Sequence, residues 1–221
     1  LPPEIRQRYE RLYTGVFYRR FVQGEWAAAQ GLVYDFFDES FVHTAPEGLE
    51  EWYISCDYGT VNPTSMGLWG KKDGIWYRTA EFYYDARKMH RQKTDEEYAD
   101  ALAELAGGRD IRAVIVDPAA ASFIETLRRR GWRVRRADNR VLSGIRLTAR
   151  LLKAGKLVIC PGCGDAIREF ALYRWEEQGD GQDRVKKEND HAMDEIRYFA
   201  ATVAERKGGG VYAGCVERGA F

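Results

Sequence analysis

Apolar and polar positions divide the chain into three parts. The first 45 residues carry a basic, aromatic pattern broken by glycines at positions 15, 24 and 31, which predicts a linker or docking segment. From Leu49 the apolar residues fall into short runs and helical spacings, which predicts a folded domain over residues 46–207. The Gly-rich stretch that follows predicts a C-terminal tail over residues 208–221. A chain of 221 residues is long enough for one good hydrophobic core.

The predicted domain begins with strands at residues 52–57, 65–71 and 76–84. The second and third are joined by Lys72-Asp73-Gly74, whose Asp-Gly pair is typical of a tight hairpin. We therefore expect the three strands to be antiparallel.

A strand–helix–strand unit is predicted further along the chain. Thr94 and Glu97 form a capping-box pattern at the start of a helix that stops at Gly107-Gly108. A strand at 111–116, a helix at 119–130 and a strand at 132–136 then predict a parallel pair. The remaining predicted elements are a helix at 141–154, a strand at 157–160, a helix within 164–175, a polar hairpin or loop within 174–187 and a helix at 190–207. The fold class is α/β, with a mixed sheet flanked by helices.

Composition narrows the class of protein. The chain has no apolar run of the roughly 20 residues that a membrane span requires, and no cationic and apolar leader. Its four cysteines, at positions 56, 160, 163 and 215, are too scattered for a disulfide framework. We expect a soluble protein of a reducing, intracellular compartment.

Charge is unevenly distributed, although 34 basic residues balance 34 acidic ones. Residues 31–57 hold seven acids and no Lys or Arg, whereas residues 128–156 hold eleven basic residues and the single acid Asp138. The acidic segment could hold a metal and the basic segment could bind phosphate. The alternative is that both charge runs are only solvated helix faces.

Two acids follow predicted strands. Asp57 ends the first strand, and Asp117 follows the strand at 111–116. Sites gather outside the carboxyl ends of parallel strands, so the two carboxylates are expected to converge. Like charges in a partly buried place are unfavourable unless they share a cation, and a hard divalent ion is the usual one. Alternatively, each Asp only caps the loop that it begins.

The last predicted helix carries a third acid. At 3.6 residues per turn, His191, Asp194 and Tyr198 lie in one sector, apart from an apolar stripe that packs on the sheet. The alternative is that Asp190 caps the helix and Asp194 complements its dipole.

These segments together resemble the ribonuclease H-like nucleases, and in detail the nuclease domain of the large terminase subunit of tailed bacteriophages. The resemblance rests on "DYGTVNPT" at 57–64, "VDPAAASFIETLRRRG" at 116–131 and "NDHAMDEIRYF" at 189–199, and it spans about residues 50–205.

The resemblance implies an acidic triad of Asp57, Asp117 and Asp194 that holds two Mg²⁺ or Mn²⁺ ions, with Asp57 as the bridging ligand. His191 is implied to act as an outer or water-positioning group. The implied activity is endonucleolytic cutting of concatemeric viral double-stranded DNA by two-metal phosphodiester hydrolysis, with little sequence preference. Two alternative hypotheses for the function are another ribonuclease H-like nuclease, of the junction resolvase type, and a non-catalytic docking module.

The resemblance also implies binding partners and a cellular localisation. An ATPase motor domain, the small terminase subunit and the portal protein are the implied partners, in the host cytoplasm and away from membranes. No G-x-x-x-x-G-K-[ST] loop occurs, so we expect no ATP site in this chain, which then corresponds to a nuclease domain whose first 45 residues follow an absent motor domain.

Basic residues near the triad are predicted to bind DNA phosphates: Arg128, Arg129, Arg130, Arg133, Arg135, Arg136, Arg140, Arg146, Arg150, Lys186 and Lys187. Cys160 and Cys163 have the spacing of half a zinc site, but without a second pair they are expected to be ordinary thiols. Whether Glu81 or Asp190 joins the metal site is left open by the sequence.

Overall fold

A six-stranded mixed sheet forms the centre of the computed structural model, which describes residues 2–13, 15–25, 29–176 and 183–205. The strands are β1 (Glu51–Asp57), β2 (Thr64–Lys72), β3 (Ile75–Tyr84), β4 (Ile111–Val116), β5 (Val134–Arg136) and β6 (Leu157–Ile159). Their order is β5-β4-β1-β2-β3-β6. The first three strands are antiparallel, while β4 runs parallel to β1, β5 to β4 and β6 to β3. The predicted mixed sheet is confirmed.

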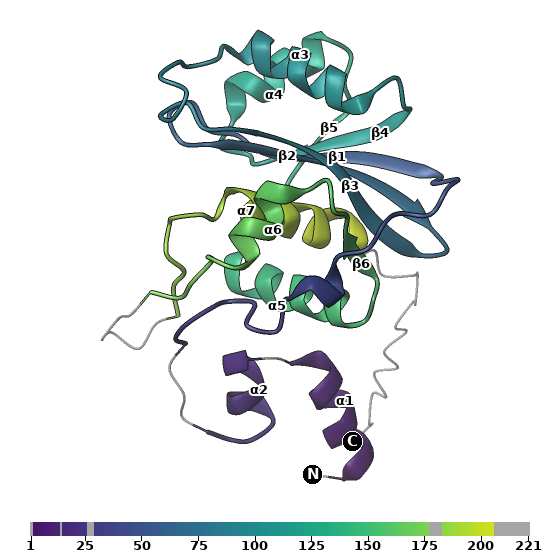
Figure 1. Ribbon diagram of the computed structural model, residues 1–221, viewed down its shortest axis with the longest axis vertical. Coiled ribbons are helices and arrows are strands. Elements are labelled where there is room, and N and C mark those ends of the chain that lie inside the picture. Colours follow the sequence, from purple (N-terminus) through teal and green to yellow (C-terminus); the bar gives the residue numbers. More distant parts are fainter. Residues whose placement is uncertain (1, 14, 26–28, 177–182, 206–221) are drawn as a thin grey trace, which may run out of the picture.

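Helices cover both faces of the sheet, so the domain has three layers (Figure 1). One face carries α3 (Asp95–Ala106) and α4 (Ala121–Arg129). The other face carries α5 (Val141–Lys153), α6 (Gly164–Phe170) and α7 (His191–Phe199). Two short helices, α1 (Pro3–Leu12) and α2 (Gly15–Phe21), lie beyond α5. A 3-10 turn, Glu39–Phe41, precedes β1.

Local sequence signals account for several boundaries. In the hairpin between β2 and β3, Asp73 and Gly74 both have positive φ, 51° and 76°, as a primed turn requires. The capping box is formed: Glu97 N donates to Thr94 Oγ1, and Thr94 N donates to Glu97 Oε2. Gly107 ends α3 in the left-handed conformation.

Two predicted helices differ from the observed ones. The helix expected within 164–175 ends at Phe170, because the chain then pairs through Trp175 with Val185 in an antiparallel bridge. The last helix keeps α geometry only to Phe199 and continues as a π-helix, Ala200–Ala204. Part of the predicted polar loop (177–182), the predicted end of the last helix (206–207) and the tail from residue 208 lie outside the described residues.

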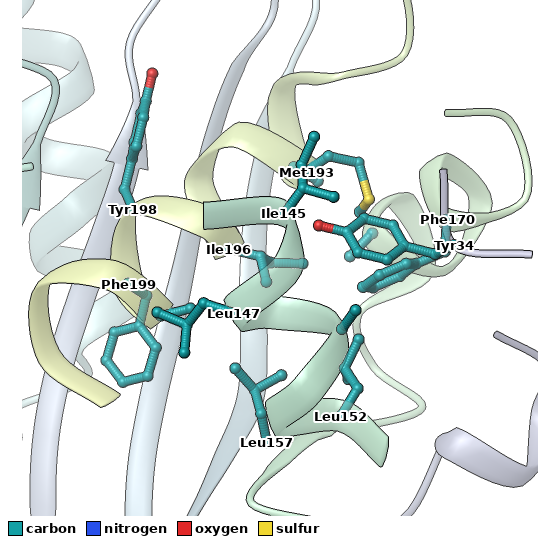
Figure 2. Close-up of a cluster of buried hydrophobic side chains, with 14 of the residues drawn as sticks. Tyr34, Ile145, Leu147, Leu152, Leu157, Phe170, Met193, Ile196, Tyr198 and Phe199 are labelled. Carbon is teal, nitrogen blue, oxygen red and sulfur yellow. The ribbon is translucent and has the colours of Figure 1, made fainter. Parts of the chain in front are cut away.

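Each face of the sheet has its own hydrophobic core. The core under α3 and α4 includes Ile54, Val114 and Phe123. The core between the sheet and α5, α6 and α7 is drawn in Figure 2, where side chains of α5 and α7 converge. In the latter core Trp69 stacks on Phe199 with ring centroids 4.0 Å apart, which adds about 1 kcal/mol beyond the burial itself.

The first 45 residues contribute to this second core, which their irregular pattern did not indicate. Phe17, Val33 and Tyr34 are buried in it, and the Tyr34 ring packs against Phe170 of α6 (Figure 2). No helix within the described residues is both long and apolar enough to span a membrane.

Candidate functional site

Asp57 and Asp117 end two neighbouring parallel strands. The residue before each acid is paired with the residue before the other in the β1–β4 register, so the two acids lie at the same edge of the sheet. Successive side chains in a strand point to opposite faces. Ser55 of β1 contacts α7, and Ile115 of β4 belongs to the core beneath α7. Both acids, two positions further on, therefore face α7.

The Tyr198 hydroxyl of α7 lies between these two carboxylates. Its oxygen is 2.8 Å from Asp117 Oδ2 and 3.5 Å from Asp57 Oδ1. Burial raises the pKa of Tyr198, and the charge of Asp57 raises it further, so the hydroxyl stays protonated and donates. The predicted set of site residues did not include Tyr198, although its helical sector, shared with His191 and Asp194, was the signal that could have found it.

His191, at the first turn of α7, contacts Asp57 directly. Its Nδ1 is 2.9 Å from Asp57 Oδ2, and both side chains are mostly buried. Burial alone would lower the pKa of His191, but the hydrogen bond and the charge of Asp57 outweigh it and raise the pKa. His191 thereby fixes the orientation of the Asp57 carboxylate.

Asp194 lies one turn further along α7, between two cations. Arg197 Nη2 is 2.8 Å from Asp194 Oδ1, and Lys187 Nζ is 3.3 Å from Asp194 Oδ2. Lys187 also lies 3.4 Å from Asp190 Oδ2. The Arg197 side chain is 2% exposed and that of Lys187 is 64% exposed. Of the two, only the Lys187 side chain can therefore turn away from Asp194 while the domain stays folded.

The charge of Asp194 affects the pKa values of two neighbouring acids, Asp57 and Asp190. Burial raises the pKa of Asp57, and the charge of Asp194 raises it further, although the His191 hydrogen bond lowers it. Burial and the charge of Asp194 likewise raise the pKa of Asp190, against the effect of Lys187. A region where two carboxylates, Asp57 and Asp190, resist ionisation favours a bound cation.

The donor chemistry fits a hard divalent cation. Carboxylate oxygens are the ligands that Mg²⁺ prefers, and the buried Oδ1 of Asp194 has an ion-pair partner but no hydrogen-bond partner. Among the described residues, however, no group of three or more His, Cys, Asp or Glu forms a cluster that could hold a metal ion. The Tyr198 hydroxyl is the group that lies between two of the carboxylates.

Solved structures of large terminases have a similar fold. The chain is similar to the large terminase of a thermophilic bacteriophage, solved in complex with ADP, at 43% sequence identity and a TM-score of 0.87 over 92% of this chain. The chain belongs to the large terminase family. It spans about half the length of that terminase, covering 52% of it.

Isolated terminase nuclease domains share the fold. The phage P22 large terminase nuclease domain matches with a TM-score of 0.61 at 17% identity, over 77% of this chain and 91% of that domain. The nuclease of thermophilic phage G20c with bound magnesium matches with a TM-score of 0.57 at 12% identity, over 77% and 97%. The ribonuclease H-like fold expected from the sequence is thereby confirmed. Neither the protein-family models nor the curated proteins gave a match.

A buried charge network supports the candidate site from within the sheet. Glu195 of α7 accepts from Arg78 Nε at 3.0 Å, from Arg78 Nη2 at 2.8 Å and from Trp69 Nε1 at 3.1 Å, and it is fully buried. Ser55 also donates to this carboxylate. A Cβ at Gly67 would lie 2.5 Å from Glu195 Oε1, so only glycine leaves room for the network. Because Glu195 follows Asp194, this network fixes the site-bearing turn of α7.

Glu81, which the sequence left open as a ligand, has other partners. It accepts from the N–H groups of Asp165 and Ala166 at the start of α6, and Arg78 Nη1 donates to it at 2.6 Å. Cys160 and Cys163 are free, buried thiols, and Cys163 Sγ donates to the carbonyl of Arg78.

The predicted basic residues are dispersed. Arg129 and Arg130, at the far end of α4 from Asp117, form ion pairs with Glu96 and Asp100 of α3. Arg150 pairs with Glu205, and Arg146 stacks over Phe17. Arg128 is exposed at the same end of α4. Arg133 lies just before β5, and Arg135 lies within it. The backbone N–H of Lys186 donates to the carbonyl of Arg174.

Two arginines lie near the acids. Arg136 is exposed and pairs with Val116 in the β4–β5 register, which places it beside Asp117. Arg140 precedes α5 and forms an exposed ion pair with Asp138 at 2.5 Å. Asn139, between them, donates to Asp117 Oδ2 at 3.4 Å.

Proposed function

We propose that the chain is a divalent-metal-dependent endonuclease that cuts concatemeric viral double-stranded DNA during genome packaging, with little sequence preference. The observation that supports the proposal is that Asp57 and Asp117, at one edge of the sheet, contact the same Tyr198 hydroxyl. Asp194, on α7, is near enough for its charge to raise the pKa of Asp57.

The solved relatives support the choice of cofactor. The G20c nuclease has been solved with bound cobalt and with bound magnesium, on the fold that this chain shares. In this chain Asp57, Asp117 and Asp194 would hold two Mg²⁺ or Mn²⁺ ions. When bound, such ions supply a water of lowered pKa as nucleophile and neutralise charge on the phosphate that is attacked.

The side chains around the acids orient them. His191 holds Asp57 Oδ2, Tyr198 holds Asp117 Oδ2, and Arg197 lies against Asp194 Oδ1. Lys187 forms ion pairs with Asp190 and Asp194, and its exposure would let it turn toward a DNA phosphate.

DNA contact near the acids is assigned to Arg136, Arg140 and Lys187, because these lie at the same end of the sheet as Asp117 and Asp194. Phosphate contacts of this kind carry no sequence information, so the cut should be largely sequence-independent. Among the partners, we propose an ATPase motor domain that precedes residues 1–45 in the whole terminase. The small terminase subunit and the portal protein complete the proposed assembly, in the host cytoplasm.

Plasmid cleavage tests the proposal. Supercoiled DNA is incubated with the purified chain in Mg²⁺, in Mn²⁺ and in EDTA, beside Asp57→Asn, Asp117→Asn and Asp194→Asn. We expect linear and fragmented products with either metal, none in EDTA, and cutting by each variant that is slower by about a hundredfold or more. Asp73→Asn is the matched control, since this residue lies in the β2–β3 hairpin and Asn tolerates its positive φ.

Other outcomes have defined meanings. Wild-type rates in any of the three site variants would remove that acid from the site. Preference for branched DNA over plasmid would favour a junction-resolving nuclease. No cutting and no calorimetric metal binding by the folded chain would leave a docking module, whereas metal binding without cutting would indicate that the motor domain is required.

A further inference from the structure

A groove of about 720 Å³ lies at the end of the sheet opposite to the acids. It is formed by the starts of β1 and β4 together with the turn between α4 and β5. Its lining residues are Tyr53, Arg109, Asp110, Ile111, Arg112, Ala113, Gly131, Trp132, Arg133 and Arg135. Because β4 has six residues, the groove lies about 20 Å from Asp117.

The groove is electropositive. Among the described residues that line it, four arginines face one acid, Asp110. Arg133 is exposed, and its side chain has no hydrogen bond or ion pair with any described residue. Arg112 lies 3.4 Å from Glu51 but is 56% exposed, and such a surface pair is weak enough to exchange for a ligand.

The other two arginines are held in place. Arg135 donates to the carbonyl of Thr202 at 2.9 Å, and Arg109 stacks over Trp52 with its guanidinium 4.7 Å from the ring centroid. The groove is therefore lined by two arginines that are held in place and two that are available to a ligand. Guanidinium groups match the oxygens of phosphate bidentately, which suits this groove to a phosphate-bearing ligand.

The groove and the acids lie toward opposite ends of one edge of the sheet. This edge is formed by β5, with the exposed Arg133 just before the strand and the exposed Arg136 at its other end, beside Asp117. A linear polyanion lying along this edge can reach both places. At about 3.4 Å per base pair, 20 Å corresponds to roughly six base pairs.

We propose that this groove binds the sugar–phosphate backbone of a DNA duplex, about six base pairs from the place where the acids would cut. The choice of DNA as the polyanion rests on the proposed function, whereas the preference for phosphate rests on the four arginines alone. Arg112 and Arg133 are the binding residues.

Fluorescence anisotropy of the full chain with a labelled duplex of about 20 base pairs in EDTA tests this without cutting. We expect Arg112→Gln/Arg133→Gln to raise Kd about tenfold and to reduce the salt dependence of binding by about two phosphate contacts, a change of roughly 1.8 in the log–log slope. Lys88→Gln/Lys156→Gln, which removes the same charge from exposed positions outside the groove, should change Kd less than about twofold. Arg112→Lys/Arg133→Lys should restore most of the affinity.

Three outcomes overturn the proposal. An unchanged Kd for Arg112→Gln/Arg133→Gln, with its circular-dichroism melt intact, removes the groove from DNA binding. An equal loss in the Lys88→Gln/Lys156→Gln control reduces the effect to net charge. Competition by inorganic phosphate at the same phosphate concentration as the duplex reduces the groove to a general anion site.

Plasmid cleavage keeps this proposal separate from the proposed function. Loss of duplex binding in the groove variant, in a chain that neither cuts plasmid nor binds metal in calorimetry, supports the groove and refutes the nuclease. Metal-dependent cutting with unaltered duplex binding in the groove variant supports the nuclease and refutes the groove.

Discussion

Arg197 joins Asp194 to the loop that holds Asp117. Its Nη2 lies 2.8 Å from Asp194 Oδ1, and its Nη1 donates to the carbonyl of Asn139 at 2.7 Å. Asn139 in turn donates to Asp117 Oδ2 at 3.4 Å. A single buried guanidinium therefore connects α7 with the turn before α5, and through it two of the acids.

Arg197→Met should destabilise the fold. The substitution keeps most of the length of the side chain but leaves the buried Asp194 with the exposed Lys187 as its remaining cationic neighbour. We expect the free energy of unfolding to fall by about 3 kcal/mol, because one partner of a buried ion pair is removed. Urea denaturation followed by circular dichroism measures it.

The matched comparison is the double variant Asp194→Asn/Arg197→Met, which removes both charges. It should recover at least half of the loss, since no uncompensated charge remains buried. A wild-type urea midpoint for Arg197→Met would show that the ion pair does not stabilise the fold.

Gly144→Ala should also be destabilising, contrary to the usual effect in a helix. A Cβ at this position of α5 would overlap Arg197 Cγ and come within 2.7 Å of Arg197 Cδ. The helical gain of about 1 kcal/mol from alanine is outweighed by overpacking against a side chain that cannot move, and we expect a net loss of about 2 kcal/mol.

Gly164→Ala at the start of α6 is the control for that substitution. A Cβ there meets no atom within 4 Å, so its stability should be unchanged or slightly raised. Equal effects of the two substitutions in thermal unfolding would contradict the role of Gly144 as the space that admits Arg197.

The sequence was sufficient for the parts of the site that depend on local signals. Apolar runs followed by breaking residues located Asp57 and Asp117 at strand ends, and the Asp-Gly turn located the hairpin that joins β2 to β3. Helical spacing brought His191 and Asp194 onto one sector, and His191 indeed contacts Asp57.

The parts that it missed depend on tertiary packing. In the sequence, Arg197 looks like an ordinary polar residue of a helix. Its burial depends on Gly144 of α5, which lies against it in space but far from it along the chain. In the sequence, the arginines from position 128 look like one basic patch. In the structure, Arg129 and Arg130 lie at the end of α4 that is far from Asp117, where they form ion pairs with acids of α3. No pattern along the chain encodes those pairings.

Cys56, Cys160 and Cys163 should react slowly with iodoacetamide in the native chain. Burial raises the pKa of all three thiols, and that of Cys163 to about 11 from 9.0. The thiolate fraction of Cys163 at about pH 8 is then about a hundredfold lower than that of an exposed thiol, apart from the steric barrier. Mass spectrometry of labelled peptides, with the chain unfolded in urea as the control, measures the rates. Fast native labelling of the Cys163 peptide would contradict its burial.

Tyr198→Phe should weaken the site without unfolding it. The substitution removes the hydroxyl that donates to Asp117 Oδ2 at 2.8 Å and keeps the ring in place. Outer groups that orient ligating carboxylates are typically worth about ten- to a hundredfold in metal affinity or activity, so we expect a Mg²⁺ concentration for half-maximal plasmid cutting that is higher by about tenfold or more.

The control for that variant is Tyr77→Phe, at the other end of β3 from the acids, which should leave the metal requirement unchanged. Calorimetric titration of Mg²⁺ into both variants gives a readout that does not depend on cutting. Weaker binding by Tyr198→Phe alone supports an orienting role for the hydroxyl. Tighter binding would show instead that the hydroxyl holds the carboxylates of Asp57 and Asp117 apart, and that it must move before a cation can enter between them.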